Sequence, residues 1–193
     1  MSRINGTIHM KEGQIIRTIQ NNGETVTFRY PRWQDVPAYV EMCNILHQER
    51  VMAYHAETSF AKGCERLSGI LVDLETGKRS HLLMEIDGGI VGEGSLQLDT
   101  AHRMGTLGIK IIGRCRRRGL GREMMLLLEA EGRKFGLRRI YLHVWHLNEA
   151  AINLYQKIGY REVGRVPEWY SMKDDEGNLV YSDLIEMIKD IGN

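Results

Sequence analysis

Apolar and polar residues repeat with two different periods along this chain, and each period predicts one type of element. Short alternating runs rich in β-branched residues predict strands, and apolar positions three or four residues apart predict helices. Strands are predicted at 26–30, 81–86, 90–98, 104–112, 139–144, 160–166 and 180–188, and helices at 36–46, 59–74, 121–135 and 149–157. The pattern therefore predicts about seven strands and about four helices.

Capping and turn residues support several of these boundaries. Asp35 precedes the first helix as a predicted N-cap, and Asn148 precedes the last helix in the same role. Gly136 follows the third helix, at a position where a glycine commonly ends a helix. The sequence Asp87-Gly88-Gly89 predicts a tight turn between two strands, so residues 81–98 are expected to form a hairpin.

The first 24 residues carry the weakest pattern in the chain. A strand is predicted at 14–19, and Asn21-Asn22-Gly23 is a favourable turn sequence. Two interpretations stay open for residues 1–24, an extra hairpin arm and a disordered tail. Residues 25–193 contain no repeat, low-complexity tract or linker, so we expect them to form a single domain.

The order of the predicted elements indicates the fold class. Helices alternate with strands in the second half, which therefore needs crossover connections and a partly parallel sheet. The predicted hairpin requires antiparallel pairs as well. We expect an α/β fold with one mixed sheet and helices on both of its faces.

Composition and charge narrow the function classes. The 193 residues are 42% hydrophobic and 26% charged, as in ordinary globular proteins, and the formal net charge of +1 argues against a general nucleic-acid binder. No apolar run approaches the roughly 18 residues that a membrane span needs, and the first residues lack the apolar core of a secretory signal. The three cysteines form no Cys-x-x-Cys pair, so we expect free thiols and a cytoplasmic location.

The stretch 109–122 has the strongest chemical pattern. An apolar strand ends at Gly113, and Arg116-Arg117-Arg118-Gly119-Leu120-Gly121 leads into the third helix. A helix N-terminus presents unpaired N–H groups, and arginines bind phosphate oxygens, so this loop suits a phosphate or pyrophosphate. It is neither a P-loop nor a complete dinucleotide fingerprint. A tight turn with a solvated basic face stays open as the alternative.

Two blocks of the chain resemble the signature of the GNAT superfamily of N-acetyltransferases. Arg116, Gly119 and Gly121 match its Gln/Arg-x-x-Gly-x-Gly/Ala motif, which lies between the fourth strand and the third helix of that fold. Residues 140–160 are similar to its fifth strand, its Asn-capped fourth helix with a tyrosine, and the closing Gly-Tyr. Residues 181–187 resemble its last strand, so the resemblance covers about 25–190.

The resemblance implies a mostly antiparallel GNAT-like sheet whose fourth and fifth strands, 104–112 and 139–144, splay apart. It also implies acetyl-CoA as the cosubstrate that donates the acetyl group. The residues implied to bind it are Ile109 and Ile111 through their backbone, the loop residues Arg116, Arg117, Arg118, Gly119, Leu120, Gly121 and Arg122, and then Asn148 and Tyr155. Arg117 departs from the family pattern, because many members carry glycine at that position.

The implied reaction is direct transfer of the acetyl group to a primary amine in a ternary complex. Tyr155 is implied as the general acid that protonates the leaving thiolate. The acceptor ammonium must lose a proton, and the candidate bases are His143 and Glu93. His143 lies twelve residues before Tyr155, where the ribosomal-protein N-terminal acetyltransferases of this superfamily carry a glutamate.

Each of these candidates also has a structural interpretation. Tyr155 is compatible with a packing tyrosine, His143 with a structural strand histidine, and Glu93 with a solvent-facing carboxylate. No metal is expected, because His143 and His146 occupy opposite-facing strand positions and would make poor co-ligands.

Nothing in the sequence identifies the acceptor as specifically as the loop indicates the donor. Tyr54, His55, Glu57 and the pair Trp169-Tyr170 lie where the family builds its acceptor site, and the aromatic pair suits either stacking on an acceptor or packing within the loop. We expect a small amine or amino-acid-like acceptor. The alternatives are a protein N-terminus or lysine, or a non-catalytic acyl-CoA sensor. We expect no nucleic-acid or membrane partner, and a homodimer stays open.

Overall fold

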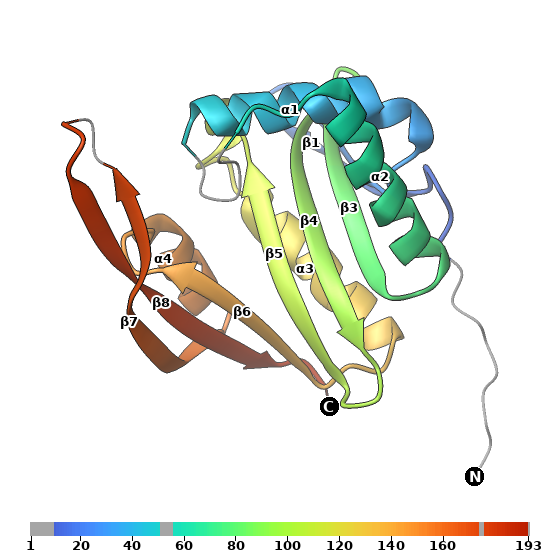
Figure 1. Ribbon diagram of the computed structural model, residues 1–193. Coiled ribbons are helices and arrows are strands. Elements are labelled where there is room, and N and C mark those ends of the chain that lie inside the picture. Colours follow the sequence, from blue (N-terminus) through green and yellow to red (C-terminus); the bar gives the residue numbers. More distant parts are fainter. Residues whose placement is uncertain (1–9, 51–55, 174–175, 193) are drawn as a thin grey trace, which may run out of the picture.

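A single twisted sheet separates two layers of helices (Figure 1). The computed structural model describes residues 10–50, 56–173 and 176–192. Within these ranges the strands are β1 (Ile15–Asn21), β2 (Glu24–Arg29), β3 (Arg79–Ile86), β4 (Gly89–Asp99), β5 (Met104–Ile111), β6 (Arg139–Trp145), β7 (Arg161–Lys173) and β8 (Leu179–Asp190). The helices are α1 (Val36–Gln48), α2 (Phe60–Glu75), α3 (Leu120–Lys134) and α4 (Glu149–Lys157), with short 3₁₀ turns at Trp33–Asp35 and Gly113–Cys115.

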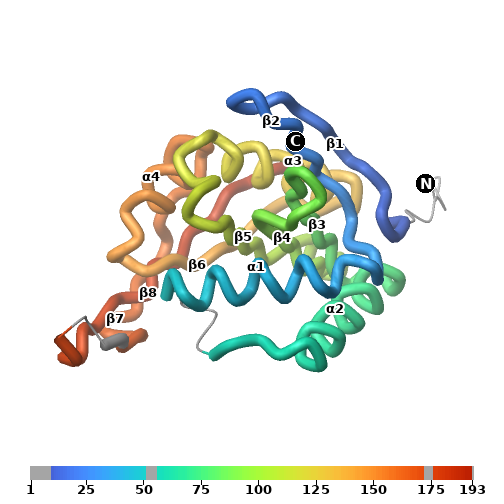
Figure 2. Tube along the Cα trace, turned by 90° about the horizontal axis from the view of Figure 1, so that it is seen from above, coloured from blue at the N-terminus to red at the C-terminus, as the bar shows by residue number. Residues whose placement is uncertain are grey.

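The strands lie in the order β1-β2-β3-β4-β5-β6-β8-β7, and every neighbouring pair is antiparallel except β5 and β6. Helices α1 and α2 cover one face of the sheet and α3 covers the opposite face, as the two perpendicular views agree (Figures 1 and 2). The fold class expected from the sequence, a mixed and mostly antiparallel α/β sandwich, is therefore confirmed. The strand count is eight instead of about seven.

The additional strand is β1, which the sequence left open as an extra hairpin arm or a disordered tail. It pairs with β2 in the main sheet, from Ile15 opposite Arg29 to Asn21 opposite Glu24. The connecting residues Asn22 and Gly23 have φ values of 53° and 82°, the left-handed conformation that a two-residue hairpin turn requires. Residues 10–24 thus extend the sheet by one strand.

Side chains on the central strands alternate between the two faces. Toward α3 the layer is apolar, and Leu96 and Leu107 are buried there. The helix approaches closely because β4 has a glycine at position 94, where a Cβ would lie 2.6 Å from Met124 and 2.9 Å from Leu128. Toward α2 the same strands present polar residues. Buried apolar side chains from α1, α2 and α3 fill both layers, and the polar positions beneath α2 are the part of this interior that is available for chemistry.

Asp35 is the N-cap residue of α1, as the sequence predicted, but it does not act as a side-chain cap. Its side chain makes no capping hydrogen bond to α1. Instead both carboxylate oxygens accept hydrogen bonds from the Arg29 guanidinium at 2.7 Å, and the carboxylate also accepts one from the backbone N–H of Arg32. A buried arginine on β2 needs an anionic partner more than an exposed helix end needs a cap, which explains the difference.

The last two strands also differ from their predicted ranges, because β7 and β8 are longer than 160–166 and 180–188. Bulges between Glu162 and Gly164 and between Val166 and Tyr170 interrupt the regular alternation of β7. Because the alternation of apolar and polar residues breaks at these bulges, the predicted strand stops at residue 166 although β7 continues. Among the described residues, no helix is both long enough and apolar enough to cross a membrane.

Candidate active site

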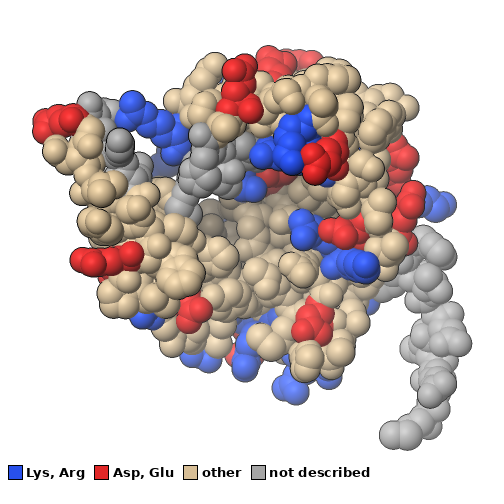
Figure 3. Space-filling model, viewed as in Figure 1, with Lys and Arg blue, Asp and Glu red and all other residues tan. Residues whose placement is uncertain are grey.

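The site begins where β5 and β6 separate. The two strands pair only from Met104 opposite Arg139 to Thr106 opposite Tyr141, and beyond that point they diverge (Figure 1). The splay that the sequence resemblance implied is therefore present. It opens a cleft of about 1360 Å³ along the free edge of β5, and the space-filling view shows this face hollowed (Figure 3).

Ile109 and Ile111 lie on that free edge and line the cleft. Their side chains are partly buried and turn toward α3, since a Cβ on Gly121 would lie 3.6 Å from the Cδ1 atom of each. This orientation leaves their backbone groups facing the opening between the strands. A chain-like ligand with amide groups can pair with such an edge as a further strand would.

The loop before α3 forms one end of the cleft. Gly119 has φ of 80°, and the first hydrogen bond of α3 runs from the Glu123 N–H to the Gly119 carbonyl oxygen at 3.2 Å. The N–H groups of Leu120, Gly121 and Arg122 precede this bond, so they are free of helical partners and point out of the helix end. Together with the helix dipole they form an anion site that opens on the cleft.

The arginines of this loop divide into two groups. Arg116, Arg117 and Arg122 line the cleft and are exposed. Arg117 has φ of 61°, which explains why glycine suits this position in the family pattern. The side chain of Arg118 points elsewhere, because its guanidinium donates to Asn21 and to the Glu24 carboxylate at 2.6 Å. The side chain thus links the loop to the β1–β2 hairpin, and a role of the Arg118 backbone in binding phosphate stays a prediction.

Arg116 is held by two neighbours at the rim of the cleft. Its Nε atom donates to the Ile111 carbonyl oxygen at 2.8 Å, and its terminal nitrogen pairs with the Glu49 carboxylate. Glu49 follows the end of α1, and it also accepts a 2.7 Å hydrogen bond from the Gly113 N–H. These contacts fix the loop against both β5 and the end of α1.

Asn148 and Tyr155 line the cleft from α4. The predicted cap at Asn148 is confirmed, since its Oδ1 atom accepts from the Ala151 N–H at 3.2 Å. Tyr155 is 7% exposed and its ring lies 6.1 Å from that of Tyr160. Burial raises the pKa of Tyr155 to about 12, so its hydroxyl keeps its proton at neutral pH and is able to donate it.

His143 lies on β6 and lines the same cleft with an exposed side chain. Its ring is 6.2 Å from that of Tyr141, whose hydroxyl donates to Glu186 at 2.6 Å. Leu142 and Val144, on either side of it, face the core. The strand therefore directs His143 toward the opening, on the face of the sheet opposite its apolar side.

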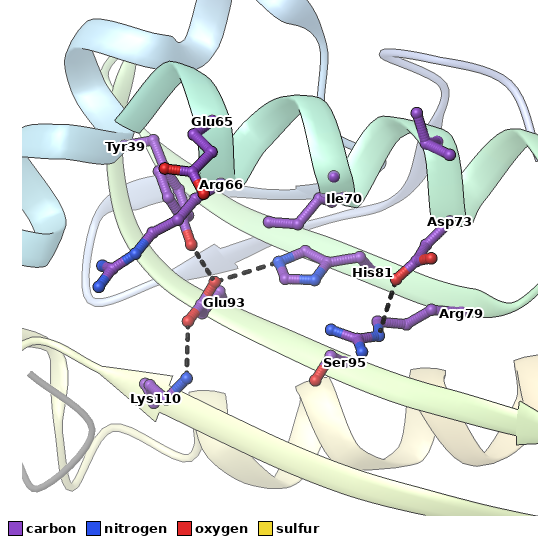
Figure 4. Close-up of a pocket in the computed structure, with 12 residues that line it drawn as sticks. Tyr39, Glu65, Arg66, Ile70, Asp73, Arg79, His81, Glu93, Ser95 and Lys110 are labelled. Carbon is purple, nitrogen blue, oxygen red and sulfur yellow. Dashed lines mark hydrogen bonds and ion pairs between the residues drawn. The ribbon is translucent and has the colours of Figure 1, made fainter. Parts of the chain in front are cut away.

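Glu93 lies away from the loop, in a second cavity of about 520 Å³ beneath α2 (Figure 4). Glu93 is 5% exposed, and the partners of its carboxylate include the Tyr39 hydroxyl at 3.1 Å, His81 Nε2 at 3.1 Å and Lys110 Nζ at 2.9 Å. Burial alone would raise the pKa of Glu93, but the Lys110 charge and the His81 hydrogen bond outweigh it and hold that pKa well below its usual range. Glu93 is therefore ionised at neutral pH.

The cavity beneath α2 contains polar residues that sequence reasoning missed. They share the α2-facing positions of the sheet or the inner face of the helix, and they are Arg66, Arg79, His81 and Ser95. Three residues, Arg79, Ser95 and Lys110, line both cavities and so mark their junction. Polar residues at alternate positions of two otherwise apolar strands are the signal that could have found them.

Of the residues expected on the acceptor side, Tyr54 and His55 lie outside the described residues, and Glu57 is exposed. Trp169 is 60% exposed. Tyr170 packs on Trp145, a residue that lines the cleft, with 5.3 Å between ring centroids. Tyr170 thus contributes packing at the β6 side of the cleft.

Comparison with known proteins gives the family and the fold. One similar solved structure is an acetyltransferase of the GNAT family from Streptococcus pneumoniae, with 23% identity and a TM-score of 0.72 over 86% of this chain and 99% of that one. A second is RimL, the ribosomal L7/L12 alpha-N-protein acetyltransferase in complex with coenzyme A, with 14% identity and a TM-score of 0.76 over 92% of this chain and 98% of that one. A third is the microcin C7 self-immunity acetyltransferase MccE in complex with acetyl-CoA and AMP, with 17% identity and a TM-score of 0.71 over 88% of this chain and 93% of that one. No curated protein matches by sequence. The sequence model of the acetyltransferase (GNAT) family matches residues 39–160. This match covers more than half of the chain, so the protein belongs to the GNAT acetyltransferase family.

Proposed function

We propose that this protein is an acetyl-CoA-dependent N-acetyltransferase that transfers the acetyl group directly to a primary amine in a ternary complex. The observation that carries the proposal is one continuous cleft that joins the N-terminus of α3, the free edge of β5 and the hydroxyl of Tyr155. An anion site, an amide-pairing edge and a proton donor are the three features that a pyrophosphate-bearing thioester requires. The solved relatives that hold coenzyme A or acetyl-CoA support this choice of donor.

Each feature has a defined role in the proposed binding of the donor. The pyrophosphate would accept hydrogen bonds from the N–H groups of Leu120, Gly121 and Arg122. The pantetheine amides would pair with the backbone of Ile109 and Ile111. Arg117 and Arg122 would supply charge at the phosphate end, since both side chains are exposed at the cleft.

The proposed chemistry is a single acyl transfer. The amine nitrogen attacks the thioester carbonyl carbon, the new C–N bond forms, and the C–S bond breaks. Tyr155 gives its proton to the leaving sulfur, which its raised pKa permits at neutral pH. The ammonium proton of the acceptor must pass to a base, for which His143 and Glu93 are the sequence-predicted candidates.

The acceptor that we propose is a small amine or an amino-acid-like molecule. The cavity beneath α2 supports this class, because its 520 Å³ suit a compact molecule and its lining carries both acidic and basic side chains. Arg66, Arg79 and Lys110 are matched in number by Glu65, Asp73 and Glu93. A balanced set of charges complements a zwitterion better than a polycation.

The test is a screen for thiol release from acetyl-CoA with L-methionine, spermidine, kanamycin and an alanine-starting peptide as acceptors. Release with at least one small amine, together with its acetylated product by mass spectrometry, is the expected result. Release with the peptide alone would move the acceptor to protein N-termini. Binding of acetyl-CoA by calorimetry without release to any amine would overturn the enzymatic proposal in favour of an acyl-CoA sensor.

A further inference from the structure

Two buried nitrogens of residues that line the cavity beneath α2 have no hydrogen-bond partner within the described residues: Arg79 Nε, which still forms an ion pair with Asp73 at 3.4 Å, and His81 Nδ1, which has no ion-pair partner for that nitrogen. His81 on β3 is 4% exposed, and its Nε2 atom lies 3.1 Å from the Glu93 carboxylate. Its other ring nitrogen, Nδ1, is buried and has no hydrogen-bond partner within the described residues. An orphaned polar atom in a native interior calls for a functional or ligand-based explanation, because an unpaired buried polar atom lowers the stability of the folded state.

The partner of Nε2 determines what Nδ1 presents to the cavity. Glu93 is ionised and accepts hydrogen bonds only, so the proton of a neutral His81 ring resides on Nε2. Nδ1 then carries a bare lone pair. A carboxylate that fixes one tautomer and stabilises the imidazolium is the arrangement that makes a histidine an effective proton acceptor.

The sheet register connects this nitrogen to the cleft. His81 lies opposite Ser95 on β4, and Ser95 lies opposite Gly108 on β5. Gly108 is beyond the last residue pair of β5 with β6, so it borders the cleft. His81, Ser95 and Gly108 thus form a row across three strands. With strands about 4.8 Å apart, this row spans about 10 Å from the open edge of β5 to His81.

The row is open on the cleft side of Ser95. A Cβ placed on Gly108 would lie 4.0 Å from the Ser95 hydroxyl oxygen, so no side chain stands between Ser95 and the cleft edge. Figure 4 shows Ser95 and Arg79 on the side of the His81 ring that faces away from Glu93. Ser95 also lines both cavities.

We propose that His81 is the final proton acceptor of the reaction and that Ser95, or a water beside its hydroxyl, relays the proton from the amine. Glu93 is then a positioning residue, which acts through His81. The inference rests on the proposed acetyl transfer and names a base that the sequence candidates did not include.

The proton and bond changes balance. One ammonium N–H bond breaks and an O–H bond forms at the relay, while the relay passes a proton to His81 Nδ1. The neutral nitrogen attacks the carbonyl carbon, the C–N bond forms, the C–S bond breaks, and the sulfur takes the Tyr155 proton. The acylated nitrogen then gives its second proton to solvent, which leaves the neutral amide. The resulting imidazolium and tyrosinate return to their starting states by losing and gaining one proton through solvent.

Several charged and titratable groups face His81 and affect its protonation. Glu93 from β4 and the carboxylates of Glu65 and Asp73 from α2 favour the imidazolium. The cations disfavour the imidazolium; they are Arg66 from α2, Arg79 from β3 and Lys110 from β5. Tyr39 from α1 contributes a neutral phenol. Removing any of these charges would also shift the pH dependence of kcat. The variants used for that measurement therefore change His81 or Ser95 and leave the ionised neighbours in place.

The first test is the tautomer, measured by long-range ¹H–¹⁵N NMR on the histidine-labelled full chain at neutral pH. The expected spectrum shows His81 protonated at Nε2 and bare at Nδ1, and Glu93→Gln is expected to lose this single tautomer. An Nδ1-protonated ring in the unaltered protein would overturn the proposal. This measurement needs neither acceptor nor turnover.

The second test is the pH dependence of kcat with the amine that releases thiol fastest in the screen. His81→Gln is expected to lower kcat about 100-fold and to remove the decline on the acidic side, because the base must be unprotonated to act. Ser95→Val, which fills the relay position with apolar atoms, is expected to lower kcat more than Ser95→Ala, which leaves room for a water. His102→Gln, an exposed histidine paired with Asp99, is the control and keeps the full profile.

Different outcomes would overturn the proton relay and the proposed acetyl transfer. A His81→Gln protein with an unchanged acidic decline would overturn the relay while acetyl transfer itself stands. Equal kcat values for Ser95→Val and Ser95→Ala would overturn the path through Ser95. Absence of thiol release from the unaltered protein with every amine would instead overturn the proposed function.

Discussion

Tyr155 differs from the other buried tyrosines near it in what raises its pKa. Burial alone acts on Tyr155, whereas the pKa values of Tyr39 and Tyr160 are raised by burial and by the neighbouring carboxylates of Glu93 and Glu129. The Tyr39 hydroxyl donates to the Glu93 carboxylate at 3.1 Å. The Tyr155 hydroxyl has no such partner among its pKa determinants, so it remains available to a ligand in the cleft.

Tyr155→Phe is accordingly expected to lower kcat by about 100-fold or more while the Kd for coenzyme A stays within about twofold. The variant removes the proton donor but keeps the ring and its packing. Steady-state thiol release and calorimetry measure the two quantities. Tyr160→Phe, which alters the ring stacked against Tyr155 by the same single atom, is the matched control. A Tyr155→Phe protein with full kcat would exclude the tyrosine as the acid.

Gly119→Asp tests the anion site at the start of α3. Gly119 has φ of 80° and a Cβ there would meet no atom within 4 Å, so the side chain would enter open space at the helix N-terminus with backbone strain. The added carboxylate would compete for the N–H groups that we assign to the pyrophosphate. We expect the Kd for coenzyme A to rise about 100-fold by calorimetry. Gly119→Ala imposes the strain without the charge, and similar Kd values for the two variants would show that charge is not the reason.

At the scale of elements, Arg118 before α3 and Arg122 in its first turn have different surroundings, so variants of the two form a matched pair. Arg118→Met breaks the link to Asn21 and Glu24 and is expected to lower the Tm, with little change in the salt dependence of coenzyme A binding. Arg122→Met, on an exposed side chain at the cleft, is expected to weaken that binding and reduce its salt dependence while the Tm stays constant. Calorimetry at two salt concentrations and thermal unfolding measure both. Equal effects of the two variants on binding would contradict the division.

The elements themselves were largely predictable, and their exceptions have physical causes. Helices with a clear apolar face and hairpins with left-handed turn residues, such as Asp87 and Gly88, form within one or two residues of their predicted ranges. The function of Asp35 could not be predicted, because the arginine that captures its carboxylate comes from a strand earlier in the chain. The length of β7 was missed because bulges break the period.

The cleft loop was predictable from its sequence because an anion site at a helix N-terminus is local: the glycines, the arginines and the helix are consecutive. The cavity beneath α2 was not, because it depends on register. His81, Ser95 and Gly108 come from three strands, and only the pairing of those strands places them in one row. For the same reason the sequence indicated Glu93 as a candidate base but did not indicate its partners Tyr39, His81 and Lys110, which lie on other elements.

At the scale of the whole molecule, the Arg29–Asp35 pair predicts how stability depends on pH. Burial alone would raise the pKa of Asp35, but its hydrogen bonds from Arg29 outweigh this and lower it. A lowered native pKa means that the pair stabilises the protein above the unfolded pKa and that this contribution is lost as the pH falls through the native pKa. The stabilisation is thus complete near neutrality and disappears in acid.

Asp35→Ala is expected to cost about 3 kcal/mol at pH 7, the low end for a broken buried pair, because the buried Arg29 guanidinium keeps the partly exposed Glu85 carboxylate as its remaining partner. Urea unfolding at pH 7 and at progressively lower pH measures the cost. The difference from the unaltered protein should shrink in acid, where Asp35 is protonated in both the native and the unfolded state. Asp99→Asn, an exposed carboxylate whose pKa is also lowered, is the control and should change stability little. A constant difference across the pH range would contradict the assignment to Asp35.

The three residue pairs between β5 and β6 are the shortest ladder in the sheet. The sheet therefore has two extensively paired parts, β1–β5 and β6–β8, joined at a narrow seam. A pantetheine arm laid along β5 would act as a ninth strand supplied from outside. The molecule that is consumed in each cycle would then also be a structural part of the protein, and the gap between the diverging ends of β5 and β6 would be filled only while the substrate is bound.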